Sequence, residues 1–108
     1  WNLVRQMRSG KAIFTQPPPP FKCAGAPQKA MYLSCDEWRR AGVLKDISVS
    51  FCTAAPALFG VADYVPALMD YVKAYNIDLQ LGSTLIAVDG VAKKATFREK
   101  DASGAEAE

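Results

Sequence analysis

The spacing of hydrophobic residues changes several times along the chain, and each change predicts a new secondary-structure element. Residues 11–15 form a short β-prone run that predicts a buried strand. In residues 46–53 apolar side chains alternate with serines, which indicates a second strand, and residues 77–81 predict a third. The stretches between these strands carry apolar residues at helical spacing. Strand and helix therefore alternate, which favours a parallel sheet with right-handed crossovers.

Proline and glycine predict where several of these elements begin and end. Pro17–Pro20 lack backbone donors, so the first strand has to end before them. Pro27 is suited to the first turn of a helix over residues 28–40, and Gly42 ends that helix. The acidic pair at 36–37 leaves open a break or the start of a second short helix.

Two further helical segments follow from the apolar pattern. Residues 1–8 predict the last turns of a helix that ends at Gly10, with its apolar side formed by Leu3, Val4 and Met7. In the later helix Asp63 can cap the start, and Pro66 fits only in the first turn. Its apolar stripe consists of Val61, Tyr64, Val65, Leu68, Tyr71, Val72 and Tyr75. We expect its tyrosines at the edge of the core rather than in a binding site.

The last predicted element is a β-hairpin. Residues 84–88 and 94–98 flank Asp89-Gly90, a turn signal with a rather long loop. The predicted fold is α/β, a three-layer Rossmann-like parallel sheet (βαβαβ) followed by this hairpin, in a single domain over residues 1–108. The loops after the first two strands lack a GxGxxG, so we do not expect the chain to bind NAD.

Composition excludes several classes of function. The chain has 108 residues, 50% of them hydrophobic, which suits one small domain with a core. A net charge of +2 without a basic cluster argues against nucleic acid as a partner. The absence of histidine excludes Ser-His-Asp triads and His-containing metal sites, and the three cysteines lack a CxxC, so no metal site is expected. No run of residues is long and apolar enough to span a membrane.

The two ends of the chain suggest cuts through a longer protein, because it starts at Trp1 inside an amphipathic segment and stops soon after a turn-like stretch. We therefore expect a truncated domain, with residues 99–108 as a flexible end. Sheet edges exposed by truncation could also drive artificial association.

Among the cysteines, Cys23 has the position best suited to chemistry. It precedes the predicted helix start at Pro27 and follows a strand, at the sheet edge where ligands gather in α/β folds. The partial positive charge of the helix N-terminus, Lys22 and Lys29 all favour its thiolate. Gly25 would let a partner molecule approach the backbone. The alternative is a buried structural cysteine, which is what we expect of Cys35 and Cys52.

At this loop the sequence resembles a known family. The stretch Lys22-Cys23-Ala24-Gly25-Ala26-Pro27-Gln28-Lys29, preceded by Phe14-Thr15-Gln16-Pro17 and followed by Met31-Tyr32-Leu33, resembles the sulfide:quinone oxidoreductases, most closely the branch with the mitochondrial enzymes. These are FAD-dependent members of the pyridine nucleotide-disulfide oxidoreductase superfamily. Two later stretches, Leu58-Phe59-Gly60-Val61 followed by Tyr64, and Ala95-Thr96-Phe97, are similar to it as well.

The resemblance implies a role for this loop. Cys23 matches one of two redox cysteines that flank the flavin, and Lys22, Gly25 and Pro27 belong to the flavin-proximal loop. In the family sulfide opens the sulfur-bridged cysteine pair, one cysteine holds a persulfide, and electrons pass through FAD to a quinone. Family membership also implies that the parent protein is cytoplasmic or peripheral on a membrane.

The FAD fingerprint, the second redox cysteine and the quinone segment of the family have no counterpart here. Cys35 and Cys52 do not match the second redox position. The chain thus resembles the central, NAD-domain-like region, and alone it is expected neither to hold FAD nor to turn over sulfide. The alternatives are a related FAD/NAD(P)-type disulfide oxidoreductase or NADH dehydrogenase domain, or a catalytically silent module that docks a partner through Pro17–Pro20.

Overall fold

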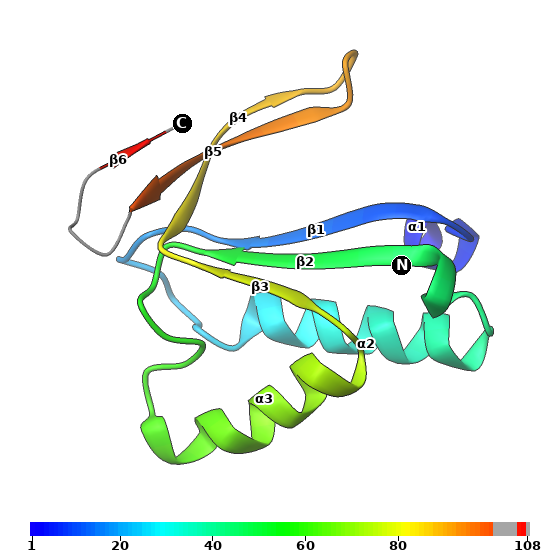
Figure 1. The fold of residues 1–108 in the computed structure, drawn as a ribbon, viewed down its shortest axis with the longest axis horizontal. Helices are drawn as coiled ribbons and strands as arrows, with labels where there is room; N and C mark the ends of the chain where they lie inside the picture. Colours follow the sequence, from blue (N-terminus) through cyan, green and yellow to red (C-terminus); the bar gives the residue numbers. More distant parts are fainter. Residues whose placement is uncertain (101–105, 108) are drawn as a thin grey trace.

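The computed structural model describes residues 1–100 and 106–107, and a three-stranded parallel sheet in the order β1-β2-β3 lies at its centre. Strand β1 (Gly10–Gln16) pairs along its whole length with β2 (Ile47–Thr53), and β3 (Asp78–Leu81) pairs with the second half of β2. Helix α2 (Ala26–Arg40) connects β1 to β2, and helix α3 (Val65–Ala74) connects β2 to β3. Both helices cover the same face of the sheet (Figure 1). This arrangement confirms the predicted βαβαβ order.

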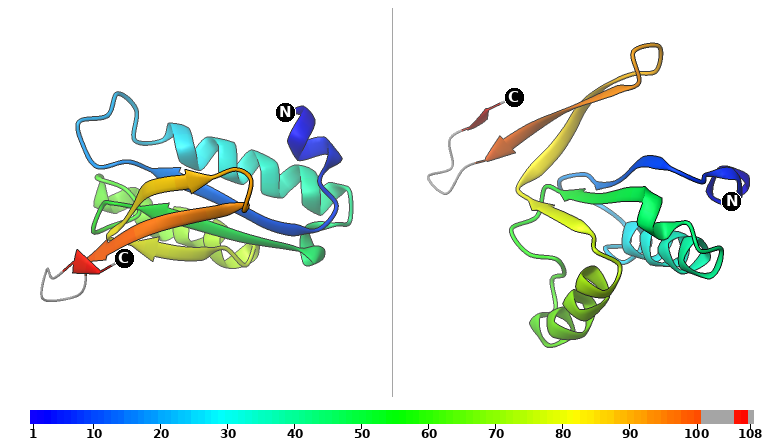
Figure 2. Two further views of the ribbon diagram at one scale, coloured as in Figure 1. Left: turned by 90° about the horizontal axis from the view of Figure 1, so that it is seen from above. Right: turned by 45° about the vertical axis from the view of Figure 1, so that its right-hand side comes forward.

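A second, antiparallel sheet lies beyond the other face of the parallel sheet. Strands β4 (Ser83–Asp89) and β5 (Lys94–Lys100) form the predicted hairpin, and β6 (Glu106–Ala107) pairs with β5. The hairpin leaves the parallel sheet at an angle, as the two views in Figure 2 show. The three layers are therefore helices, parallel sheet and antiparallel sheet.

Shorter elements complete the chain. Helix α1 (Asn2–Gln6) precedes β1, as the sequence predicted, but it ends at Gln6, and Gly10 is the first residue of β1 rather than the end of the helix. The 3-10 turn η1 (Leu44–Asp46) leads into β2, and the 3-10 turn η2 (Ala62–Tyr64) leads into α3. Of the end segment expected to be flexible, residues 99–100 belong to β5 and 106–107 to β6, whereas 101–105 and 108 lie outside the described residues.

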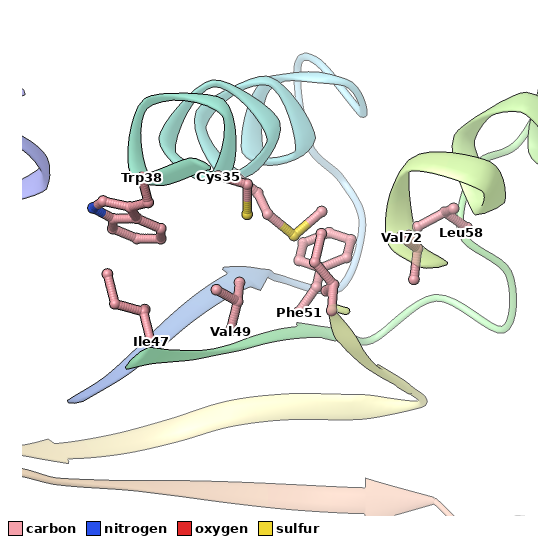
Figure 3. Close-up of a cluster of buried hydrophobic side chains, with 9 residues drawn as sticks. Cys35, Trp38, Ile47, Val49, Phe51, Leu58 and Val72 are labelled. Atoms are coloured by element: carbon pink, nitrogen blue, oxygen red, sulfur yellow. The ribbon is translucent and has the colours of Figure 1, made fainter. Parts of the chain in front are cut away.

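The core forms where one face of α2 packs on the central strand β2. Met31, Cys35 and Trp38 repeat at helical spacing and are at most 2% exposed. They face the alternate β2 residues, as Figure 3 shows for the labelled side chains. Those residues are Ile47, Val49 and Phe51. Burying a side chain of this size stabilises the fold by about 1.5–3 kcal/mol, so the α2–β2 contact provides much of the stability of the domain.

The first strand and the first helix are less buried than the sequence predicted. Ile13 on β1 is 38% exposed, because no helix covers that face of the sheet. The prediction of a buried strand is therefore wrong for this face. Leu3, placed on the apolar side of α1, is 82% exposed, whereas Val4 and Met7 pack against the core as expected.

Three local predictions for the helices are corrected as well. Helix α2 does not break at its acidic pair, since Asp36 forms ion pairs with Arg39 and Arg40 on the same helix. Asp63 does not cap α3, because it lies within η2 and the N-cap position belongs to Tyr64. Tyr64 and Tyr71 are exposed, because only one stripe of α3, centred on the buried Val72, meets the core.

A single glycine separates the two sheets. Gly82 lies between β3 and β4 with φ = +68°, a conformation that side chains with a Cβ rarely adopt. Its N–H donates to the carbonyl of Ala55, and its own carbonyl accepts from the N–H of Lys100. The sharp change of direction between the sheets therefore depends on this residue.

Candidate functional site

The loop that carries Cys23 lies at the carboxyl edge of the parallel sheet. Strand β1 ends at Gln16, directly before the four prolines, and α2 begins at Ala26. Cys23 is exposed, so the alternative of a buried structural cysteine is wrong. Its backbone carbonyl accepts from the N–H of Ala26 at 3.3 Å. The thiol-bearing residue is thus tied to the first turn of α2, as the sequence predicted.

The other predicted loop residues flank this position. Lys22 is exposed beside Cys23, and Pro27 occupies the first turn of α2. Gly25 is the N-cap residue, and a Cβ built on it would meet no atom within 4 Å. The space where a side chain would begin at Gly25 is therefore empty.

The start of α2 is poorly suited to hold the diphosphate of a dinucleotide. Such sites use free amide groups in the first turn of a helix. Here the N–H of Ala26 donates to the carbonyl of Cys23, and Pro27 has no N–H, so two groups of the first turn are unavailable to a ligand. With no GxGxxG before it, this helix start offers a diphosphate fewer amide donors than a dinucleotide-binding loop.

The two other cysteines have environments opposite to that of Cys23. Cys35 is fully buried in the core, and this burial raises the pKa of its thiol to about 12. Burial also raises the pKa of Cys52, against a hydrogen bond from Ser83 that lowers it. Both thiols stay protonated and inaccessible near neutral pH, so Cys23 is the thiol available for exchange.

Gln28 positions the start of α2, a role that sequence reasoning missed. Its side-chain nitrogen donates to the carbonyl of Leu58 at 2.7 Å, and its side-chain oxygen accepts from the hydroxyl of Tyr32 at 3.1 Å. These bonds tie the loop after β2 to the first turn of α2. A glutamine on the apolar side of a helix is the signal that could have indicated a buried amide in need of partners, although not which partners.

A pocket of about 360 Å³ opens between the first turns of α2 and α3. Gly25 and Gln28 line it on one side, and Tyr64 and Leu68 line it on the other. A larger hollow of about 790 Å³ lies at the opposite edge of the sheet, around Asp46 and Asn76, and does not include the Cys23 loop. The smaller pocket is therefore the one that adjoins the candidate site.

Sequence similarity to known proteins indicates the family of the chain. It is 42% identical over 97 residues to the mitochondrial sulfide:quinone oxidoreductase of Schizosaccharomyces pombe, covering 88% of the chain and 21% of that protein. It is 36% identical over 104 residues to the mouse enzyme of the same name, covering 96% of the chain and 23% of that protein. The Dictyostelium discoideum enzyme is 30% identical over 98 residues. These matches support a fragment of the sulfide:quinone oxidoreductase family. The chain spans about a fifth of the length of these relatives.

Solved structures support the fold. The sulfide:quinone oxidoreductase of Aquifex aeolicus superposes with a TM-score of 0.69 at 18% identity, over 90% of this chain and 23% of that one. A chain of the Tetrahymena thermophila mitochondrial ATP synthase reaches 0.76 at 14% identity, over 96% of this chain and 26% of that one. The fold alone thus occurs outside the family. No protein-family model matches the sequence.

In the described part of the chain, none of the helices combines the length and hydrophobicity needed to cross a membrane.

Proposed function

We propose that this chain contributes Cys23 as one of the two redox cysteines of a flavin-dependent sulfide:quinone oxidoreductase. The observation that carries the proposal is the exposed thiol of Cys23 within the family-like stretch 22–29, next to the start of α2. The mitochondrial sulfide:quinone oxidoreductases that are similar over 88% and 96% of the chain support the reaction class. Lys22, Gly25 and Pro27 would form the loop that faces the flavin.

The chemistry proposed for Cys23 is thiol–disulfide exchange with sulfide. When Cys23 and the second redox cysteine form a disulfide, HS⁻ attacks one of its sulfur atoms and the S–S bond between the cysteines breaks. One cysteine becomes a persulfide (S–SH), and the other leaves as a thiolate that keeps the electron pair. Sulfide sulfur is oxidised by two electrons and the disulfide is reduced by two. The persulfide sulfur then passes to an acceptor.

The flavin, when bound to the whole enzyme, would accept that electron pair and pass it to quinone. Because this loop lacks a GxGxxG and has no free amide donor at Ala26 or Pro27, we propose that other parts of the enzyme hold FAD. We also propose that the whole protein attaches peripherally to a membrane, where its quinone would be found.

A Cys23→Ser variant of the full-length enzyme tests the role of this thiol. We expect sulfide-dependent quinone reduction to fall by at least 100-fold, on the order of the losses seen when a reacting group is removed. The flavin absorbance of the purified variant should stay unchanged, because the serine keeps the loop intact. Retained turnover would instead favour a catalytically silent module.

Selective alkylation provides a second test, on the 108-residue chain itself. Iodoacetamide at pH 8 should modify Cys23 and leave Cys35 unmodified until the protein is unfolded, because Cys35 is fully buried. Mass spectrometry of the digested chain identifies the modified residue. Equal modification of both cysteines in the folded protein would contradict the proposal.

A further inference from the structure

The pocket between α2 and α3 has the size and lining of a small-molecule site. Its volume of about 360 Å³ falls in the range of ligand pockets, roughly 300–1,000 Å³. Three aromatic rings line it, those of Tyr32, Phe59 and Tyr64, together with the apolar side chain of Leu68. The rings of Phe59 and Tyr64 meet edge-on with their centroids 6.3 Å apart. Such walls favour a flat apolar body.

The polar groups of the pocket narrow the class of ligand. Both ends of the Gln28 amide are already engaged, with the carbonyl of Leu58 and the hydroxyl of Tyr32. The Gln28 amide therefore does not need a hydrogen bond from a ligand. Lys29 is the cationic residue of the lining, is exposed, and forms no salt bridge within the described residues. An unpaired ammonium group at the rim of an apolar pocket is complementary to an anion.

We propose that this pocket binds an aromatic molecule that carries one anionic group. The aromatic body lies against Phe59 and Tyr64, and the anionic group pairs with Lys29 at the rim. Gly25 lines the same pocket, so the bound molecule lies against the loop of Cys23. The inference concerns binding alone and does not rest on the redox role of Cys23.

Two matched probes test the proposal by fluorescence titration of the 108-residue chain at low salt. 8-Anilinonaphthalene-1-sulfonate has an aromatic body and one sulfonate, and N-phenyl-1-naphthylamine has the same body without charge. Lys29→Gln should weaken the binding of the anionic probe about two- to fivefold, the effect of one exposed ion pair, and leave the neutral probe unaffected. Tyr64→Ser should weaken both probes about two- to tenfold.

Two further variants distinguish binding in the pocket from non-specific binding to other apolar surfaces. Ala67→Glu adds a negative charge at an exposed lining position and should weaken the anionic probe more than the neutral one. Val88→Ser removes a 69% exposed apolar side chain on the distant hairpin and should change neither. Circular dichroism and urea midpoints show that each variant is folded.

The outcomes decide the proposal. Selective loss of the anionic probe in Lys29→Gln, with loss of both probes in Tyr64→Ser, supports it. Equal effects of Val88→Ser and Tyr64→Ser would overturn it, as would a Lys29→Gln variant that binds both probes like the parent chain. A chain that sediments as a dimer and binds neither probe would also overturn it. These titrations measure binding and not turnover, so a negative result here does not affect the test of Cys23.

Discussion

The buried thiol of Cys35 should make the stability of the fold depend on pH in the alkaline range. Its side chain is fully buried, and burial raises the pKa from an ordinary value of 9.0 to about 12. Below pH 9 the thiol is protonated in both folded and unfolded chains, and the full stability is present. As the pH rises toward 12 the unfolded chain releases this proton and the folded chain retains it. Stability therefore falls over this window.

The size of the effect follows from the two pKa values. At pH 10 the unfolded thiol is mostly ionised and the folded thiol is not, so Cys35 accounts for a loss of about 1.4 kcal/mol between pH 8 and 10. Burial also raises the pKa of Tyr32 to about 12, with a smaller contribution from the charge of Cys35, and Tyr32 adds to the loss at still higher pH. For a small domain, about 1.4 kcal/mol is a large part of the total stability.

Urea unfolding of the 108-residue chain at pH 8, 9 and 10, with a reductant present, measures this dependence. The Cys35→Ala variant loses core contacts at every pH, so the comparison is between slopes and not absolute stabilities. Its stability should decrease by about 1.4 kcal/mol less than that of the parent chain between pH 8 and 10. Identical slopes in the parent and Cys35→Ala would refute the reasoning.

Three further substitutions test single contacts by urea unfolding at pH 7.5. Gly82→Ala should cost about 1–2 kcal/mol because φ = +68° is strained for any residue with a Cβ; an unchanged midpoint would contradict the hinge assigned to it. Trp38→Phe removes the 2.8 Å hydrogen bond to the carbonyl of Val4 and should lower the free energy of unfolding by about 1–3 kcal/mol. Because this bond holds α1, a protease should also cleave the first eight residues sooner in the variant than in the parent chain. Gln28→Leu leaves the buried carbonyl of Leu58 without its 2.7 Å partner and should lower the free energy of unfolding by about 1–3 kcal/mol. Gln28→Glu keeps an acceptor for the Tyr32 hydroxyl and loses the donor to Leu58, so comparing the two variants shows how much each hydrogen bond contributes.

The position of the candidate site was predictable because its signals are local. Four prolines end β1 wherever the chain folds, since they lack donors, and Pro27 favours the first turn of a helix. These two constraints place Cys23 in a loop between a strand and a helix. The alternation of apolar residues and serines in β2 similarly predicted which of its side chains enter the core.

Features that arise from contacts between residues far apart in the sequence were decided only by the tertiary structure. Gln28 and Leu58 are 30 residues apart, and no local pattern indicates that an amide on one meets the carbonyl of the other. The exposure of Tyr64 and Tyr71 has the same origin, because periodicity shows that a helix has an apolar side but not how wide a stripe its neighbours cover. Local backbone chemistry thus determined the order of elements and the loop of the thiol, whereas packing between elements determined the pocket, the exposure of the tyrosines and whether Cys23 itself is accessible.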